Sequence, residues 1–234
     1  MQAKTLPVVE KILSANDLIA LENRKLLDGH GVLAVNVMAS PGAGKTSLIL
    51  RSIAALQGRL RVGVIEGDVA GRVDADKVAE TGTPVVQINT GGGCHLDAPQ
   101  VQSALKELPL GEIDLLFIEN VGNLICPTGF ALGEHVNMML AHVPEGHDKP
   151  IKYPGMFTVV DALVLNKTDL LPYIDFDLGT FSTAFRALNP GAPLFQISCK
   201  TGEGVEAWAE WLLARTAERD GSSQAVVHDR SVDR

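Results

Sequence analysis

The segment Ala39–Thr46, which reads Ala-Ser-Pro-Gly-Ala-Gly-Lys-Thr, contains residue types that bind phosphate. It lies between an apolar run and a stretch of helical periodicity, which is the context that such a loop requires. Glycines let backbone N–H groups close around an anion, and a helix N-terminus adds partial positive charge. We expect Lys45 to reach the β- and γ-phosphates of a nucleotide and the Thr46 hydroxyl to bind Mg²⁺. The expected phosphate-binding residues are Gly42, Ala43, Gly44, Lys45, Thr46 and Ser47.

Ala39 departs from the usual phosphate-loop pattern, which has a glycine at this position. Alanine is small, so we expect it to be tolerated if its φ angle is negative. The alternative is a chance glycine-rich turn between a strand and a helix. The Gly-Lys-Thr sequence in the correct frame makes that alternative the weaker one.

A second motif, Asn166-Lys167-Thr168-Asp169, follows the apolar run Ala162–Leu165. A carboxylate only accepts hydrogen bonds, and guanine offers two adjacent donors that Asp169 can accept together. Adenine presents one acceptor and one donor there, so it would leave a group unpaired. The Lys167 stem can cover the base, and Ser198-Cys199-Lys200 resembles the small-residue loop behind a guanine. The motif alone could be a plain strand-to-loop turn, but its place about 120 residues after the phosphate loop favours GTP over ATP.

The apolar run Ile113–Ile118 ends in Glu119, and Asn120-Val121-Gly122 follows. This resembles the D-x-x-G motif that senses the γ-phosphate in GTPases, with Glu in place of Asp. We expect Glu119 near Mg²⁺ and the Gly122 N–H at the γ-phosphate. Asn123 stands where some GTPases keep a water-positioning Gln, so we expect slow hydrolysis of GTP.

Asp68 and Asp74 follow the second expected strand, where a nucleotide-responsive loop would lie. Either could stand near Mg²⁺. Asp68 could equally be a turn residue at the strand end, and Asp74 could be the N-cap of a helix.

Cys94 and His95 lie between an expected strand and helix, and Cys126 follows Glu119 by seven residues. Two thiolates and an imidazole suit Zn²⁺ or Ni²⁺. We expect neighbouring parallel strands to bring the two loops together. The alternative is two buried apolar cysteines and a histidine at a helix start. Three ligands leave a four-coordinate site incomplete, so water or a second chain would complete it. A shift of the Cys126 loop between the GTP and GDP states would make metal binding depend on the nucleotide.

Composition narrows the functional classes. The chain has 234 residues, 46% of them hydrophobic, and a formal net charge of −8 with scattered basic residues, which argues against nucleic-acid binding. Three cysteines do not make a disulfide framework. The start lacks a signal-peptide pattern and the longest apolar runs are too short to cross a bilayer, so we expect a cytoplasmic protein with no membrane contact.

Hydrophobic periodicity places these motifs on alternating strands and helices. The expected strands are Val32–Met38, Arg61–Ile65, Pro84–Ile88, Ile113–Ile118, Asp161–Leu165 and Leu194–Ile197. The expected helices are Thr46–Leu56, Asp74–Glu80, Ala98–Leu108 and Val205–Ala217, preceded by one or two helices in Leu6–Leu27. The order predicts an α/β fold with a doubly wound, mostly parallel sheet. We expect an N-terminal helical extension in residues 1–28, a P-loop GTPase domain in 29–218 and a flexible tail in 219–234.

From about Leu21 to Trp211 the sequence resembles the HypB-type family of hydrogenase nickel-incorporation GTPases. The distinctive segments are residues 65–68, 89–97, 117–127 and 152–154. The resemblance implies a GTP-dependent homodimer that helps to insert nickel into the large-subunit precursor of [NiFe]-hydrogenase, with a HypA-type nickel chaperone as partner. It also implies Ni²⁺ or Zn²⁺ on Cys94, His95 and Cys126 near the dimer interface, and Asp74 and Glu119 near Mg²⁺. Lys152 matches a residue that reaches the partner subunit.

Some members of that family carry an N-terminal Cys-x-x-Cys-Gly-Cys site or a histidine-rich stretch. Here no cysteine precedes Cys94, and Met1–Gly29 contains no histidine. Nickel would therefore use the Cys94 site or come directly from a partner. The alternatives are a urease-type maturation GTPase, a non-catalytic metal-binding or storage protein, and a small-molecule kinase, for which no substrate-binding arginine cluster is visible.

Overall fold

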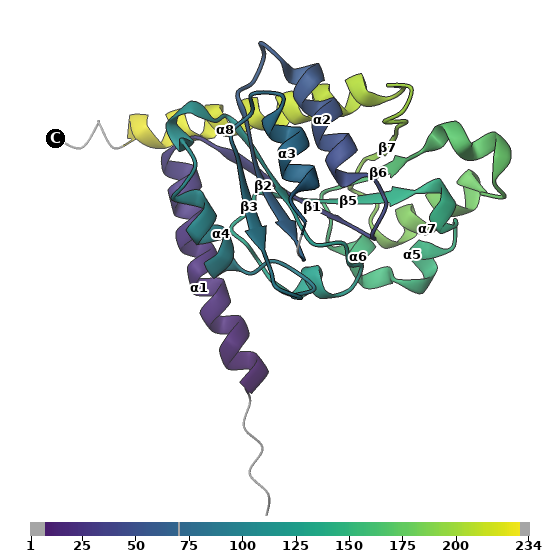
Figure 1. Cartoon of the computed structure of the whole chain (residues 1–234), viewed down its shortest axis with the longest axis horizontal. Helices are drawn as coiled ribbons and strands as arrows, with labels where there is room; N and C mark the ends of the chain where they lie inside the picture. Colours follow the sequence, from purple (N-terminus) through teal and green to yellow (C-terminus); the bar gives the residue numbers. More distant parts are fainter. Residues whose placement is uncertain (1–7, 70, 230–234) are drawn as a thin grey trace, which may run out of the picture.

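One sheet of seven parallel strands forms the centre of the chain, in the order β3-β2-β4-β1-β5-β6-β7 (Figure 1). The computed structural model describes the backbone of residues 8–69 and 71–229, and side chains within 15–69 and 71–219. The strands are β1 Leu33–Ala39, β2 Val62–Asp68, β3 Val85–Asn89, β4 Leu115–Glu119, β5 Val136–His142, β6 Ala162–Asn166 and β7 Leu194–Gln196. The predicted doubly wound α/β fold is confirmed, and every pairing among these strands is parallel.

Helices cover both faces of the sheet because the central strands are apolar on both sides. Helices α2 (Lys45–Leu56), α3 (Val73–Ala79) and α8 (Val205–Asp229) cover the face to which the odd-numbered residues of β1 contribute. Helices α1 (Val8–Gly29), α4 (Ala98–Leu105), α6 (Pro154–Thr158) and α7 (Leu178–Leu188) cover the other face. Figure 1 shows α2, α3 and α8 toward the top, α1 and α4 at the left, and α6 and α7 toward the lower right. The short helix α5 spans Lys149–Lys152, and η1 to η4 are single 3-10 segments at Leu110–Glu112, Cys126–Gly129, Val143–Glu145 and Thr168–Tyr173.

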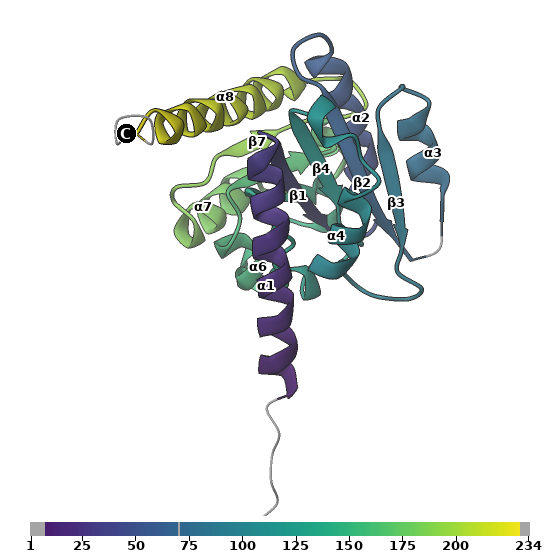
Figure 2. The same ribbon diagram turned by 90° about the vertical axis from the view of Figure 1, so that its left-hand side faces the viewer.

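Helix α1 is one continuous helix, and two buried asparagines attach it to the body of the protein. Asn23 Nδ2 donates to the Ala98 and Leu132 carbonyls at 2.9 Å each. Asn16 donates to the Ala131 carbonyl at 2.8 Å and accepts from the Ala98 N–H at 2.8 Å. The N-terminal part of the helix extends away from the sheet (Figure 2). The asparagines therefore hold α1 to the segments that follow Cys94 and Cys126.

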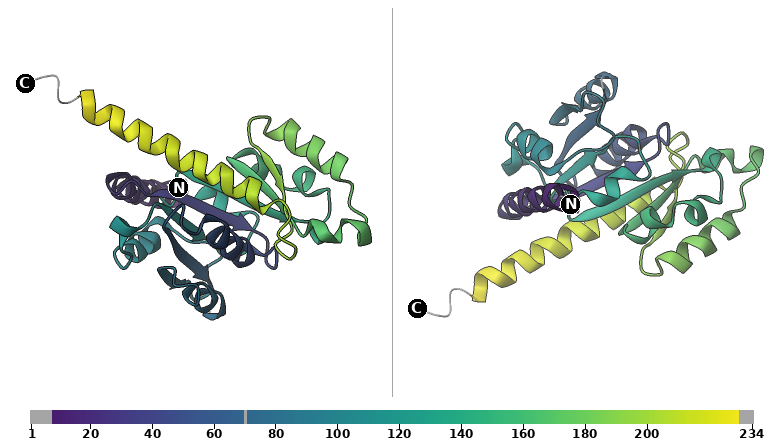
Figure 3. Two further views of the ribbon diagram at one scale, coloured as in Figure 1. Left: turned by 90° about the horizontal axis from the view of Figure 1, so that it is seen from above. Right: turned by 90° about the horizontal axis from the view of Figure 1, so that it is seen from below.

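Several elements differ from the sequence expectations. Strand β5 was not predicted, because Val-Asn-Met-Met-Leu-Ala-His mixes strand and helix formers; it lies between β1 and β6 and is buried from both sides. Helix α7 was missed as well. Helix α8 continues to Asp229, and its last turns extend past the sheet (Figure 3), where we had placed a flexible tail from residue 219. The apolar pattern stops near Ala217, but helical hydrogen bonding does not need an apolar face.

Within the described residues, no helix combines the length and apolar character needed to cross a bilayer.

Candidate nucleotide and metal sites

The parallel sheet brings the predicted site residues to one edge. Strands β1, β2, β4 and β6 end at Ala39, Asp68, Glu119 and Asn166. In a parallel sheet these carboxyl ends lie on the same side, and ligands of open α/β sheets bind there. Segments far apart in the sequence therefore line one common site.

The phosphate loop adopts a glycine-dependent backbone. Gly44 is the N-cap of α2 in the left-handed conformation, with φ of 98°, and Gly42 has φ of 74°. A Cβ at Gly44 would lie 2.7 Å from Asn166 Nδ2, so a side chain there would collide with the base-binding motif. Ala39 is the last residue of β1 and has no positive φ; among the described non-glycine residues only Lys167 has one, at 62°. The backbone condition under which we expected alanine to be tolerated at this position is therefore met.

Two phosphate-loop residues contact Glu119 at the end of β4. The Thr46 hydroxyl donates to Glu119 Oε1 at 3.0 Å, and Lys45 Nζ lies 3.8 Å from the same oxygen. A cavity of about 210 Å³ borders these residues together with Asp74 of α3. This arrangement has the composition of a Mg²⁺ and phosphate site.

Glu66 of β2 joins this cluster and was not among the predicted ligands. Glu66, Asp74 and Glu119 each offer a carboxylate oxygen, and these oxygens lie within 4.8 Å of one another. The available signal was an acidic residue inside an apolar strand, Val-Gly-Val-Ile-Glu-Gly-Asp. The sequence pattern favoured the half-buried Asp68 at the strand end over the buried Glu66.

The buried carboxyl groups of this cluster lack enough neighbouring positive charge. Burial, together with the neighbouring carboxylate of Glu119, raises the pKa of Glu66 to about 8. Burial also raises the pKa of Glu119 to about 7, although Lys45 and Thr46 act in the opposite direction. Glu66 Oε2 and Glu119 Oε2 are buried without a hydrogen-bond partner. A divalent cation fits this donor set because it would supply both the missing charge and the missing partners.

Glu66→Gln is expected to stabilise the protein at pH 8 in the absence of divalent ions. In the folded wild type Glu66 keeps its proton up to about pH 8, whereas the unfolded chain releases it near 4.5. The folded state binds more protons in this window, so wild-type stability falls as pH rises from about 4.5 to 8. Gln does not ionise, so the variant should lack this loss.

Thermal unfolding of both proteins between pH 4.5 and 8 measures the difference. We expect the melting temperature of Glu66→Gln to exceed that of wild type by at least ~2 °C at pH 8, with little difference at pH 4.5. Glu107→Gln, at an exposed position, controls for the loss of one negative charge. A difference of the same size at all pH values would contradict the assignment of the raised pKa to Glu66.

The base-binding residues surround a second cavity of about 340 Å³. Asn166 Nδ2 donates to the Ala43 carbonyl at 2.9 Å, and its Oδ1 accepts from the Cys199 N–H at 3.1 Å. The Ser198 hydroxyl donates to Asp169 Oδ1 at 2.7 Å and so orients the carboxylate. The residues lining the cavity are Gly44, Ser47, Asn166, Lys167, Asp169, Leu170, Cys199 and Lys200.

Two further contacts shape this cavity. Lys167 Nζ donates to the Gly42 carbonyl at 2.7 Å, so its stem spans from the base motif to the phosphate loop. Arg51 of α2, which sequence analysis did not select, donates to the carbonyls of Cys199 and Lys200 at 2.7 and 3.0 Å. Burial raises the pKa of the Cys199 thiol to about 11, so it is a neutral wall of the cavity.

Cys94, His95 and Cys126 form a second cluster, with ligand atoms within 4.8 Å of one another. Cys94 Sγ lies 3.4 Å from His95 Nδ1. Burial lowers the pKa of His95, which favours the neutral imidazole that binds metals. The ring of Phe130 lies 3.9 Å from that of His95. The donors fit a soft divalent metal ion such as Ni²⁺ or Zn²⁺.

The cluster forms by a different route from the one we expected. The loops follow β3 and β4, which are not neighbours, because β2 lies between them. The loop after β3 crosses the end of β2, where the Leu96 side chain lies over Gly67; a Cβ there would be 2.8 Å from Leu96. The lack of a side chain at Gly67 therefore allows the two loops to meet.

Three other predicted residues have different surroundings. Asp68 ends β2, and its carbonyl accepts from the Thr90 N–H at 2.9 Å. Lys152 is exposed on α5 and pairs with Asp148. Asn123, which stands where some GTPases keep a water-positioning Gln, accepts at its Oδ1 from the Ile125 and Cys126 N–H groups at 2.8 and 3.2 Å. Asn123 therefore shapes the turn that carries Cys126.

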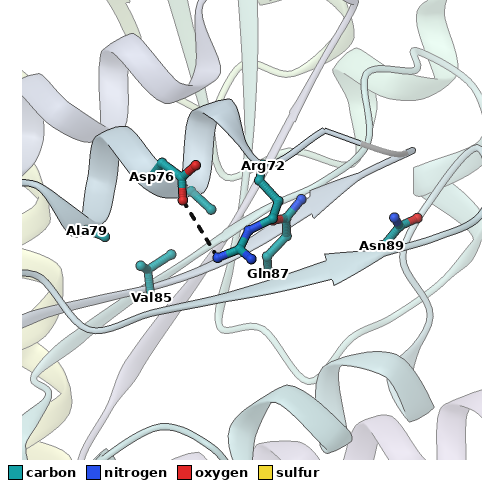
Figure 4. Close-up of a pocket in the computed structure, with 7 residues that line it drawn as sticks. Arg72, Asp76, Ala79, Val85, Gln87 and Asn89 are labelled. Atoms are coloured by element: carbon teal, nitrogen blue, oxygen red, sulfur yellow. Dashed lines mark ion pairs between the residues drawn. The ribbon is translucent and has the colours of Figure 1, made fainter.

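A cavity of about 470 Å³ lies apart from both clusters, between α3 and the edge strand β3 (Figure 4). Arg72 and Asp76, one turn apart at the start of α3, form an ion pair of 3.8 Å on the helix side of the cavity. The cavity contains none of the predicted site residues.

The fold and the loops at its carboxyl edge define a P-loop nucleotide-binding protein. Residues 33–196 match the family model described as "CobW/HypB/UreG, nucleotide-binding domain". The chain is 47% identical over 218 residues to the hydrogenase maturation factor HypB of Rhizobium leguminosarum bv. viciae, covering 93% of this chain and 73% of the relative. It therefore belongs to the HypB hydrogenase maturation factors within this family.

Solved structures agree with this assignment. A crystal structure of the hydrogenase maturation factor HypB from Archaeoglobus fulgidus has a TM-score of 0.82 at 37% identity, covering 87% of this chain and 99% of that one. A structure of HypB from Helicobacter pylori in complex with nickel has a TM-score of 0.83 at 36% identity, covering 87% and 96%.

Proposed function

We propose that this protein is a slow GTPase that delivers nickel for the maturation of [NiFe]-hydrogenase. The observation that carries the proposal is the position of the thiolate and imidazole cluster beside the nucleotide site. Both Glu119 and Cys126 lie in the segment that begins with β4, seven residues apart. A nucleotide-dependent movement of this segment would change the position of a metal ligand.

The base cavity supports GTP as the nucleotide. Asp169 is oriented by Ser198 and faces a cavity bordered by Lys167 and Cys199. A carboxylate in this position accepts the two adjacent donors of guanine. Such base selection has no use in a metal-storage protein, so the cavity argues against storage. Steady-state turnover of GTP but not ATP would separate the two.

The phosphate site supports hydrolysis. Mg²⁺ would be held by Thr46, Glu119 and Asp74, with Glu66 behind them, and it would neutralise charge on the β- and γ-phosphates. Lys45 supplies a further positive charge, and Gly122 is the expected γ-phosphate contact. Asn123 is committed to the Cys126 turn. The absence of a glutamine at this position supports slow turnover.

The metal cargo would be Ni²⁺ or Zn²⁺ on Cys94, His95 and Cys126. The Helicobacter pylori relative was solved in complex with nickel, and the same three ligand types in this chain fit that ion. Three protein ligands leave one position of a four-coordinate site for water or a second chain.

A homodimer is supported by exposed apolar side chains around the same edge. Val73, Ile125 and Ile151 are 67%, 66% and 65% exposed. Val73 lies on α3, Ile125 directly precedes the ligand Cys126, and Ile151 lies on α5. Lys152 lies next to Ile151 and would reach the partner copy.

A HypA-type nickel chaperone and the hydrogenase large-subunit precursor are the proposed protein partners. The cytoplasm, where GTP is available, is the proposed location.

Cys126→Ala is expected to lower the affinity for Ni²⁺ by more than about 10–100-fold, the range for loss of an outer-shell contact. Removing one of the three ligands also removes the negative charge of its thiolate from the site. Chelator competition, with GDP and with a non-hydrolysable GTP analogue, measures this affinity. Thr128→Ala is the matched control, because Thr128 lies in the same turn but bonds only the Ile125 carbonyl. Unchanged nickel affinity in Cys126→Ala would reduce the cluster to a structural role.

A urease client is the second candidate. One relative, from Helicobacter pylori, is named "Hydrogenase/urease maturation factor HypB" and is 37% identical over 229 residues, covering 96% of this chain and 94% of that protein. Restoring nickel-dependent hydrogenase or urease activity in cells that lack their own factor distinguishes the clients. Restoration of urease alone would replace the hydrogenase assignment.

A further inference from the structure

The buried side chain of Asn120 joins the nucleotide-sensing segment to the metal loop. Asn120 directly follows Glu119 and is fully buried. Its Oδ1 accepts two backbone hydrogen bonds, from the Leu96 N–H and from the Val121 N–H, each at 3.0 Å. Leu96 is the residue after His95. One oxygen atom therefore connects the backbones of the two segments.

The segment on one side of Asn120 is in contact with the phosphate loop. Gly122 lies against Pro41, because a Cβ at Gly122 would be 3.0 Å from Pro41 Cα. A change of position in the phosphate loop or at the γ-phosphate must therefore displace Gly122. The displacement reaches Val121, whose N–H is bonded to the Asn120 side chain.

The segment on the other side is rigid enough to follow. Leu96 is completely buried in the core between the sheet and α4, over Gly67. Asp97 caps α4 with a reciprocal bond to Gln100. A movement of the Leu96 N–H therefore cannot be absorbed by a loose loop, and it shifts the neighbouring His95 and Cys94.

The Asn120 amide is itself held in one orientation. Its Nδ2 donates to Asn36 Oδ1 at 3.2 Å, and Asn36 Nδ2 donates to Asn137 Oδ1 at 3.0 Å. These three asparagines lie in a row near the centre of the sheet, with Asn120 directly after β4, Asn36 in β1 and Asn137 in β5. The row fixes which amide atom is the acceptor, so Oδ1 always faces Leu96 and Val121.

We propose that Asn120 is the positioning residue that transmits the nucleotide state to the metal ligands Cys94 and His95. Asn120 touches neither metal nor nucleotide. It acts by fixing the Leu96 amide relative to the Val121 amide. This inference rests on the proposed function, because it concerns how the nucleotide and the metal influence each other.

The test compares Asn120→Ala with Asn23→Ala in the full-length chain. Both remove a buried asparagine side chain that bonds two backbone groups, but Asn23 bonds Ala98 and Leu132 and does not reach the sensor. Ni²⁺ affinity is measured by chelator competition with GDP and with a non-hydrolysable GTP analogue. The ratio of the two affinities is the readout, because a purely structural role lowers both affinities and leaves the ratio unchanged.

We expect wild type and Asn23→Ala to show the same ratio, within the roughly 5–150-fold range of couplings between sites. In Asn120→Ala the ratio should fall to within about twofold of one, while each ligand still binds alone. A wild-type ratio in Asn120→Ala overturns the inference and leaves the GTPase and metal assignments intact. A ratio of one in the wild type overturns both this inference and the idea that the nucleotide controls metal binding. If the wild type neither turned over GTP nor bound nickel, the proposed function itself would be overturned.

Hydrogen exchange of the wild-type protein gives a second measurement that needs no variant. The Leu96 amide is protected by its bond to Asn120. We expect its protection to differ between the GDP and GTP-analogue states, while the Ala98 amide, bonded to Asn16, stays the same. Equal protection of Leu96 in both states contradicts the inference even if Asn120→Ala does not fold.

Discussion

Asp169→Asn is expected to lower the affinity for GTP by roughly 10²–10⁴-fold, because one of the two hydrogen bonds from guanine is lost and the other no longer has a charged acceptor. The carboxylate accepts from both guanine donors, whereas the Asn amide brings one acceptor and one donor. Its N–H₂ group would then face the exocyclic amine of guanine, donor against donor. Xanthine carries an oxygen in place of that amine, so we expect the variant to prefer xanthosine triphosphate.

Equilibrium titration with fluorescent GDP and xanthosine diphosphate measures this change. Ser198→Ala is an informative comparison, since it removes the hydroxyl that orients Asp169 at 2.7 Å but keeps the carboxylate. It should weaken GTP binding without exchanging the preference for the base. If Asp169→Asn bound both bases as the wild type does, the base would not lie in the cavity between Lys167 and Cys199.

Lys45→Ala is expected to reduce GTP turnover by about 10²–10³-fold, the typical loss when one preorganised charge-stabilising donor is removed. Lys45 is the cation nearest Glu119 in the described site, at 3.8 Å, and it lowers the pKa of that carboxyl against the effect of burial. Its loss removes positive charge from the phosphates and leaves Glu119 more readily protonated. Both effects weaken the site for Mg²⁺ and nucleotide.

Single-turnover hydrolysis at saturating GTP separates this loss from weaker binding. Lys106→Ala, on the exposed end of α4, controls for the loss of one lysine. The rate should also recover little at high Mg²⁺, because a metal ion held by the carboxylates would not replace the positive charge that Lys45 brings to the phosphates. Turnover of Lys45→Ala at the wild-type rate would remove this residue from the catalytic group.

Prediction from the sequence was most complete where the functional residues are contiguous in the chain. The phosphate loop and the Asn166–Asp169 motif each lie within eight residues. Their glycines, lysines and carboxylate have fixed spacing, and a strand before them and a helix or loop after them suffice to orient them. The strand predicted at Ile113–Ile118, which is observed at Leu115–Glu119, was found for the same reason, because an apolar run ending in a carboxylate is a local signal.

Prediction failed where the partners are distant or the local signal is mixed. Strand β5 has methionines and an alanine that equally suit a helix, and only its position between β1 and β6 makes it a strand. The order of the strands was not available from spacing, so we placed the loops of Cys94 and Cys126 on neighbouring strands. In the structure β2 separates them, and the loop after β3 crosses it over Gly67.

The sequence by itself predicted the class of nucleotide, the phosphate loop and the residues that we propose as metal ligands, because backbone conformation and hydrogen-bonding capacity are properties of adjacent residues. Only the tertiary structure decided that Glu66 rather than Asp68 joins the acidic cluster, and that Asn120 bonds the Leu96 amide. Both depend on strand order and register, which arise from packing across the whole sheet. A side chain's partner across 24 residues is therefore set by the fold and is absent from the local pattern.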